Sequence, residues 1–126
     1  MVEVAIYEGI RNFPGIEIYR KQFKLYKETG TPPLRFGKDA SYSWPSTAVD
    51  AELRHIHVTD LPAPWVQSTP QENRTTDSHL IYTRGYFHQD NYLILAFLAL
   101  DAHASAEKVT FMASLADIAE QFRSKY

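Results

Sequence analysis

Hydrophobic and polar residues follow two different periods in the first thirty residues of the chain. Val2, Val4 and Ile6 alternate with their neighbours, which predicts a half-buried strand. Beyond a break at residues 12–15, apolar residues recur at spacings of three, four and three. They form the stripe of an amphipathic helix, made of Ile16, Tyr19, Phe23 and Tyr26. Gly30 supplies a C-terminal stop for this helix.

Three further strands are predicted in the second half of the chain. They cover residues 54–58, 79–87 and 92–100. The first of them ends at the proline-containing residues 61–64, and a polar loop over residues 67–76 leads to the next. The last strand is apolar at consecutive positions, which is typical of a central strand covered on both faces.

A second amphipathic helix closes the chain, and Ser105 is placed to cap it. Its apolar residues recur at spacings of four, three and four, and they are Phe111, Leu115, Ile118 and Phe122. Residues 34–52 are expected to be irregular. The order of strand, helix, long loop, three strands and helix predicts one α+β domain over residues 1–126. In it, helices cover one face of a small, mainly antiparallel four-stranded sheet.

Composition fits this picture and excludes several classes of protein. With 126 residues, of which 44% are hydrophobic and 22% charged, the chain is long enough for a packed core. It has no cysteine, which excludes disulfides and thiolate metal sites. Its longest apolar run is about half the length of a membrane helix, and its start lacks the basic residues of a signal peptide. We therefore expect a cytoplasmic protein with no membrane partner.

The charge is unevenly distributed along the chain. The net charge of −2 argues against a strongly basic nucleic-acid binder. However, residues 11–38 carry seven basic and two acidic side chains, a net +5, whereas residues 39–73 carry a net −4. The basic residues either form a face that meets phosphates or are simply the solvated side of a helix. The candidates for contact with the phosphates of a nucleic acid are Arg20, Lys21, Lys24, Lys27 and Lys38.

Aromatic residues beside cations add a second kind of candidate RNA contact. Tyr82 and Arg84 alternate on a predicted strand, and Trp44 lies in the irregular segment. Aromatic rings can stack on unpaired bases. Packing in the core is the alternative role for the same residues.

Two histidines on one predicted strand are candidates for acid–base chemistry. His55 and His57 are two residues apart, so both imidazoles project from the same face of the strand. An imidazole with a pKa near 6.5 can act as general base or general acid at neutral pH. The same pair could begin a metal site, or the two could be ordinary strand residues.

A second cluster lies where the polar loop meets the next strand. Arg74 offers a fork of donors suited to a phosphate. Asp77 and His79 alternate, so the carboxylate could orient an imidazole. A surface ion pair and a cap to the strand form the structural alternative. Combined with His55 and His57, Asp77 and His79 could instead ligate a metal ion.

Five short segments in series resemble the YafO-type toxins of bacterial type II toxin–antitoxin systems. The likeness runs in order from about Leu34 to the C-terminus. It rests on Phe36-Gly37-Lys38-Asp39-Ala40, Trp44-Pro45, His55-Ile56-His57, Arg74-Thr75-x-Asp77-x-His79-Leu80-x-Tyr82 and Glu120-x-Phe122-Arg123. The resemblance implies an mRNA interferase that cleaves translated mRNA on the ribosome and is held inactive by a cognate antitoxin. It also implies a RelE/ParE-like fold and a reaction that needs no metal or other cofactor.

The resemblance also implies how the candidate residues divide the work. In RelE-like toxins, side chains on the concave face of the sheet hold the phosphate, help the 2′-OH attack it and protonate the departing 5′ oxygen. His55 and His57 are then the base and the acid, in either order. Arg74 stabilises the transition state, and Asp77 and His79 orient these groups or share the proton transfer. RelE-like ribonucleases tend to carry lysines in this groove, where this chain has histidines.

Two other classes of function remain open at this point. A toxin of the same fold can act as a non-catalytic interaction module on a protein target. A metallohydrolase could use His55, His57 and His79 as ligands.

Overall fold

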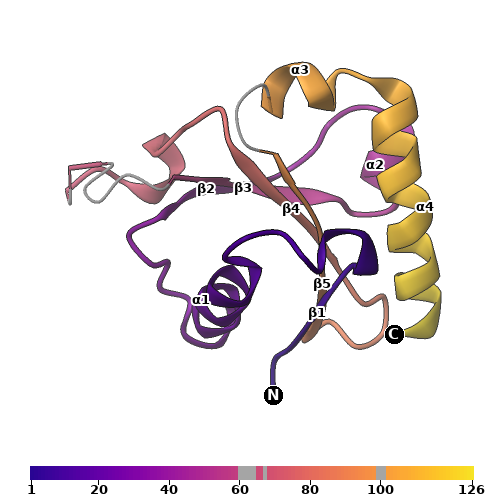
Figure 1. The fold of residues 1–126 in the computed structure, drawn as a ribbon, viewed down its shortest axis with the longest axis horizontal. Helices are drawn as coiled ribbons and strands as arrows, with labels where there is room; N and C mark the ends of the chain where they lie inside the picture. The colour runs from indigo at the N-terminus through magenta and orange to yellow at the C-terminus, as the bar shows by residue number, and fades with distance from the viewer. Residues whose placement is uncertain (60–64, 67, 99–101) are drawn as a thin grey trace.

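The chain folds around one five-stranded sheet (Figure 1). The computed structural model describes residues 1–59, 65–66, 68–98 and 102–126. The spatial order of the strands is β1-β5-β4-β3-β2, with β1 parallel to β5 and the other neighbours antiparallel. This architecture confirms the prediction of a mainly antiparallel α+β protein. The strands are β1 (Glu3–Ile6), β2 (Phe36–Ser41), β3 (Arg54–Val58), β4 (His79–Arg84) and β5 (Asn91–Leu98).

The prediction of a four-stranded sheet is wrong because residues 34–52 are not irregular. They contain β2 and the short helix α2 (Ser46–Asp50). β2 lies at the edge of the sheet, next to β3. Only its first two residues, Phe36 and Gly37, are buried, so the strand has no alternating pattern that the sequence could reveal.

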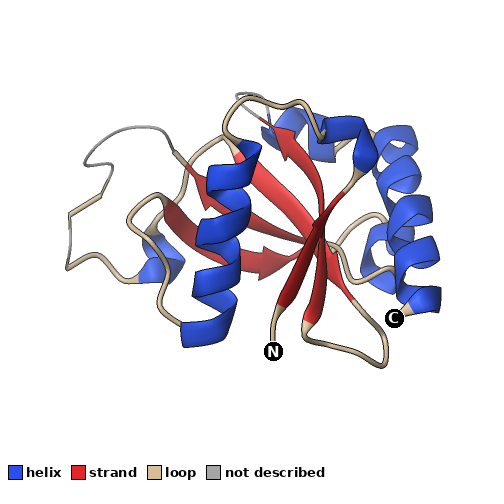
Figure 2. Cartoon of the chain, turned by 60° about the horizontal axis from the view of Figure 1, so that its bottom comes forward, coloured by secondary structure: helices blue, strands red, loops and turns tan. Residues whose placement is uncertain are grey.

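Helices cover both faces of the sheet, which corrects the expectation that they cover one (Figure 2). α1 (Ile16–Thr29) lies across one face, while α2 and α4 (Val109–Lys125) pack on the other; α3 (Ala102–Ala106) precedes α4. The reason is visible in β5. Ile94 packs on the α1 side, whereas Leu93 and Leu95 pack on the α4 side. A strand that is apolar on both faces needs cover on both faces.

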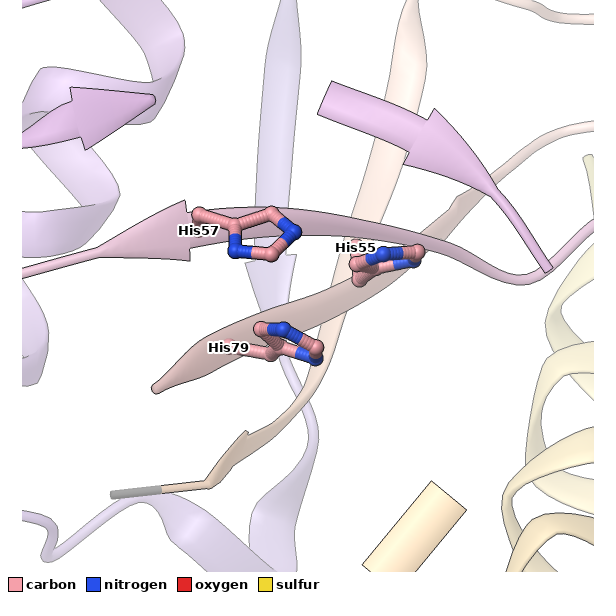
Figure 3. A group of neighbouring side chains, drawn as sticks. All are labelled: His55, His57 and His79. Carbon is pink, nitrogen blue, oxygen red and sulfur yellow. The ribbon is translucent and has the colours of Figure 1, made fainter. Parts of the chain in front are cut away.

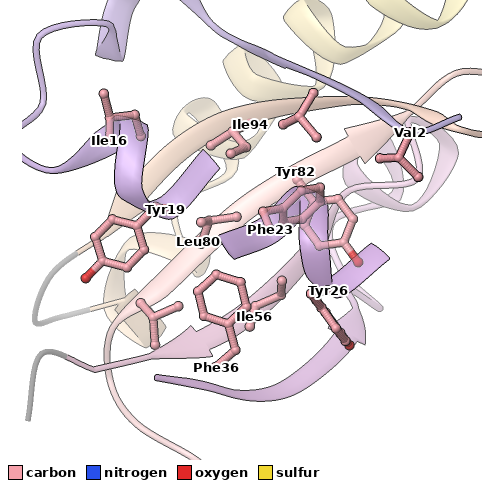
Figure 4. Close-up of a cluster of buried hydrophobic side chains, with 12 residues drawn as sticks. Val2, Ile16, Tyr19, Phe23, Tyr26, Phe36, Ile56, Leu80, Tyr82 and Ile94 are labelled. Carbon is pink, nitrogen blue, oxygen red and sulfur yellow. The ribbon is translucent and has the colours of Figure 1, made fainter. Parts of the chain in front are cut away.

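Aromatic side chains dominate the core on the α1 side (Figure 4). The predicted stripe of α1 is buried there, which confirms it, and Gly30 ends the helix in a left-handed conformation. The Phe23 ring meets the rings of Tyr82 and Tyr92 edge-on, with centroids 4.8 and 5.3 Å away. The buried residues of this core are Val2, Val4, Ile16, Tyr19, Phe23, Tyr26, Phe36, Ile56, Val58, Leu80, Tyr82 and Ile94.

The core on the α4 side is built from smaller side chains. Alanines on α4 and α2 allow both helices to approach the sheet closely, and Met112 and Leu115 fill the space between them. Ser105 does not cap this helix, because it belongs to α3 and α4 begins only at Val109. The predicted helix is otherwise confirmed.

One predicted strand and one predicted loop differ from the structure in detail. The strand predicted over 79–87 ends at Arg84, where a turn leads into β5. The polar loop contains a short 3₁₀ helix, η2 (Gln71–Asn73). Residues 99–100 of the last predicted strand, Gln67 and the proline-containing residues 61–64 lie outside the described residues.

Candidate functional site

Three histidines meet on the face of the sheet opposite α1 (Figure 3). His57 on β3 is directly paired with His79 on β4, and His55 lies two residues earlier on the same face of β3. The ring centroids of His57 and His79 are 4.3 Å apart, and those of His55 and His79 are 4.6 Å apart. One nitrogen from each ring lies within 4.8 Å of the other two. The structure therefore brings together three of the five predicted catalytic residues.

The surroundings of the three rings fix their positions. His57 and His79 are buried, with 4% and 2% of their surface exposed. The backbone of Thr76 lies 2.8–2.9 Å from Nδ1 of His57 through both its N–H and its carbonyl oxygen. This contact occupies Nδ1 of the ring. His55 is half-buried and stacks on Tyr42 at 4.3 Å between ring centroids.

The environment of His55 favours its neutral form. Burial, followed by the neighbouring His57, lowers the pKa of His55 to about 4. The ring is therefore uncharged at neutral pH and can accept a proton. Its Nδ1 atom is buried, and no hydrogen-bond partner for it is found within residues 1–59, 65–66, 68–98 and 102–126.

The same three imidazoles could hold a divalent metal ion. Three histidines are the protein ligands of one common type of catalytic zinc site, with Zn–N distances of about 2.0–2.1 Å. That geometry places the ligand nitrogens about 3.4 Å apart, whereas here they lie within 4.8 Å. The ring nitrogens would have to move closer together to bind an ion.

Arg74 and Asp77, the other two predicted catalytic residues, lie on the segment that leads into β4. The guanidinium Nε of Arg74 donates a hydrogen bond to the carbonyl oxygen of Thr69 at 2.9 Å. Asp77 is exposed, two residues before His79. The catalytic role of both residues stays a prediction.

A second polar cluster, centred on Asp39, lies on the α1 side of the sheet. The Asp39 carboxylate accepts hydrogen bonds from the hydroxyl groups of Tyr82 at 2.7 Å and Tyr26 at 2.9 Å. It also pairs with Nζ of Lys27 at 2.9 Å and with Nη2 of Arg54 at 3.4 Å. Burial opposes ionisation of this carboxyl, but the Lys27 ammonium and the Tyr82 hydroxyl outweigh it and lower the pKa of Asp39.

Lys27 is held inside this cluster and is not part of a solvated helix face. Its ammonium lies 4.6 Å from the Tyr26 ring centroid and 4.8 Å from that of Tyr82, within the range of cation–π attraction. Burial lowers the pKa of Lys27, and nearby Arg54 and Arg84 add to that effect, whereas Asp39 opposes it. The periodicity of the helix did not reveal the burial of Lys27, because this residue follows the last apolar residue of the stripe, Tyr26, and is not part of the stripe itself.

Two adjoining hollows open at this cluster. The first, about 230 Å³ in volume, is lined by Lys27, Arg54, Tyr82, Arg84 and Tyr92. The second, about 260 Å³, shares Arg54 with it and is also lined by Tyr26, Lys38, Asp39, Gln71 and Glu72. Of the residues predicted to contact RNA, Lys27, Tyr82, Arg84 and Lys38 therefore lie together.

The remaining predicted RNA-binding residues lie apart from these hollows. Arg20 pairs with Glu17 on the same helix at 2.9 Å. Lys21 is exposed, Lys24 is half-buried, and Trp44 is half-exposed in the loop before α2.

Sequence reasoning missed Arg54, Asp39 and Tyr92 as members of a site. Arg54 did carry a signal, because it alternates with Ile56 and Val58 and so must share their core-facing side of β3. A charged residue at such a position needs a buried partner. Asp39 is that partner, but it comes from a strand without any recognisable pattern.

Comparison with known proteins places the chain in a family. The family model described as Toxin YafO, type II toxin–antitoxin system, matches residues 24–124. The chain is 32% identical over 109 residues to the mRNA interferase toxin YafO of Escherichia coli (strain K12), and the match covers 82% of each protein. No solved structure matches the chain.

Proposed function

Because the chain belongs to the YafO family of toxins of type II toxin–antitoxin systems, we propose that it is an endoribonuclease that cleaves translated mRNA on the ribosome. Membership of this family implies an antitoxin as partner. The observation that carries the proposed activity is the meeting of His55, His57 and His79 on one face of the sheet. We propose that the protein acts in the cytoplasm, at the ribosome. None of the helices among the described residues is long and apolar enough to span a membrane.

Three imidazoles can perform the two proton transfers that RNA cleavage requires. A general base takes the proton of the 2′-OH, whose oxygen attacks the adjacent phosphorus. A general acid protonates the 5′ oxygen as the P–O bond breaks, which leaves a 2′,3′-cyclic phosphate and a 5′-hydroxyl. The rings lie side by side on one face of the sheet, so two of them could act on the same phosphate from that face.

The environments of the rings support a division of roles. His55 is neutral at pH 7, with a pKa of about 4, and is therefore our candidate for the base. A bound phosphodiester is anionic and favours the imidazolium form of a neighbouring ring. His57, held by the Thr76 backbone, or His79 would then supply the proton.

Arg74 and Asp77 would support this reaction from the adjoining segment. The Arg74 guanidinium would exchange the Thr69 carbonyl for a phosphate oxygen and stabilise charge in the transition state. Asp77 would orient an imidazole. Both roles are proposed for the protein with RNA bound.

Primer extension on mRNA from cells that express the chain tests the activity. We expect cleavage products with the wild type and their loss with His55→Gln, His57→Gln and the double variant. His88→Gln is the matched control, because His88 is exposed in the turn between β4 and β5. Thermal unfolding monitored by circular dichroism must show that the variants fold. Intact mRNA with the wild type would reject the nuclease and favour action on a protein target.

The three-histidine geometry also favours a second candidate, a metal-dependent hydrolase. A metal-dependent enzyme would lose its activity in a chelator and recover it on addition of Zn²⁺. The proton-transfer proposal expects full activity in the chelator.

A further inference from the structure

We propose that the hollow lined by Lys27, Arg54, Tyr82, Arg84 and Tyr92 binds a phosphate group of ribosomal RNA. This hollow, called here the α1-side hollow, lies on the opposite face of the sheet from the three histidines. Its ribosomal partner rests on the proposed function. The hollow itself is argued from charge and geometry.

The α1-side hollow carries more positive than negative charge. Three cations line it, and Asp39 is the carboxylate that contacts two of them, Lys27 and Arg54. The Asp39 oxygens are already engaged by two tyrosine hydroxyls as well as by these cations. One carboxylate is therefore shared between two cations, and together with the third cation they leave the hollow with a net positive charge.

Arg84 is the cation that this arrangement leaves available. Among the described residues, no acidic group lies within ion-pair distance of its guanidinium. It lies near enough to Lys27 to lower the pKa of that amine further. An anion in the hollow would relieve this repulsion between like charges, and a planar guanidinium is well suited to a phosphate.

The adjoining hollow extends the positive region along the sheet. It adds Lys38 and Glu72 to the charges, so the two hollows together hold four cations and two anions. Arg54 lines both and connects them. A chain of phosphates could follow this path, with one group at Arg84 and another near Lys38.

The lining favours RNA over an acidic peptide. Tyr92 is half-buried and lines the hollow, where a base could stack on the exposed part of its ring beside the bound phosphate. A carboxylate side chain of a peptide carries the same single charge but brings no base to stack beside it. The position is also informative, because the molecule could hold ribosomal RNA with one face of its sheet and mRNA with the other.

Binding of Arg84→Gln to purified ribosomes tests the proposal. We expect the affinity of this variant to fall about tenfold, as for loss of one charge-assisted contact. The slope of log affinity against log salt should become shallower by about one. Arg11→Gln is the matched control, since it removes the same charge outside the hollow. Arg11 is exposed and pairs with Glu8. Equal binding by Arg84→Gln and the wild type would overturn the proposal.

The outcomes separate this site from the proposed catalytic site. The His55→Gln/His57→Gln double variant should bind ribosomes like the wild type even though it cleaves nothing. Wild-type binding without cleavage would reject the nuclease and leave the hollow standing. No binding of the wild type to ribosomes would overturn the ribosomal partner.

A direct probe decides the chemical class of the ligand. In NMR titrations, a uridine hexanucleotide should shift the signals of Arg84 and Tyr92 in the wild type. If a glutamate hexapeptide shifts them and the oligonucleotide does not, the ligand is an acidic protein segment and the RNA proposal is overturned. Absence of any shift would overturn the site.

Discussion

The Asp39→Asn substitution should strongly destabilise the protein. Asp39 and Lys27 form a buried ion pair, with 8% and 16% of their side-chain surfaces exposed and 2.9 Å between Nζ and Oδ2. The substitution leaves the Lys27 ammonium and the Arg54 guanidinium without a carboxylate. Breaking a buried pair from one side costs about 3–5 kcal/mol, because the remaining charge stays desolvated. A loss of this size is a large fraction of the 5–15 kcal/mol by which domains are stable.

Urea unfolding followed by tryptophan fluorescence measures this loss. Asp90→Asn is the matched control, since Asp90 is exposed and lies 3.9 Å from the N-terminal amine; its cost should stay below about 0.5 kcal/mol. Replacing both partners, in Lys27→Met/Asp39→Asn, should cost less than the sum of the two single changes. A loss under about 1 kcal/mol for Asp39→Asn would refute the reasoning.

The pH dependence provides an independent check on Asp39. Its folded pKa is lowered, so the unfolded chain binds a proton more readily than the folded one. The stabilisation is therefore present above the ordinary pKa of about 3.9 and is lost as the pH falls through the lower folded value. The wild type should lose this contribution below about pH 4, and Asp39→Asn should lack it.

Three further predictions concern a close contact and the histidines. Gly37→Ala should destabilise the protein by about 1–3 kcal/mol in the same urea assay, because the new Cβ would clash with the backbone carbonyl oxygen of Arg74. Stability equal to the wild type would contradict this close approach. The pKa of His55 is lowered to about 4, so between pH 6.5 and 4 the unfolded chain binds a proton that the folded chain refuses. Stability should therefore fall as the pH is lowered through this window, and His55→Gln should flatten that slope in melts at several pH values. Zn²⁺ should inhibit RNA cleavage by occupying the nitrogens of His55, His57 and His79, with activity restored by a chelator; insensitivity to Zn²⁺ in a direct cleavage assay would show that these nitrogens cannot converge on an ion.

Most of the regular elements could be predicted because their patterns are local. The stripe of α1, its stop at Gly30 and the alternation in β1 each lie within one short segment. β2 could not be predicted in this way. It is an edge strand of six residues with little burial, and it is held in place by β3 rather than by its own pattern.

The candidate site was predictable only in part, for the same reason. The shared face of His55 and His57 follows from the two-residue period of any strand. Their meeting with His79 depends on the register between β3 and β4, which pairs His57 with His79 across 22 positions of sequence. A shift of one residue in that register would turn His79 away to the α1 side.

The class of fold, the chief helices, the pair of histidines on one face and the resemblance to a toxin family all follow from local patterns in the chain. Which charges are buried depends instead on how distant segments pack together. Lys27 has the sequence context of a solvated helix residue, yet Asp39, Tyr26 and Tyr82 enclose it. The physical reason is that a charge becomes buried through partners from distant segments, and local periodicity holds no information about those partners.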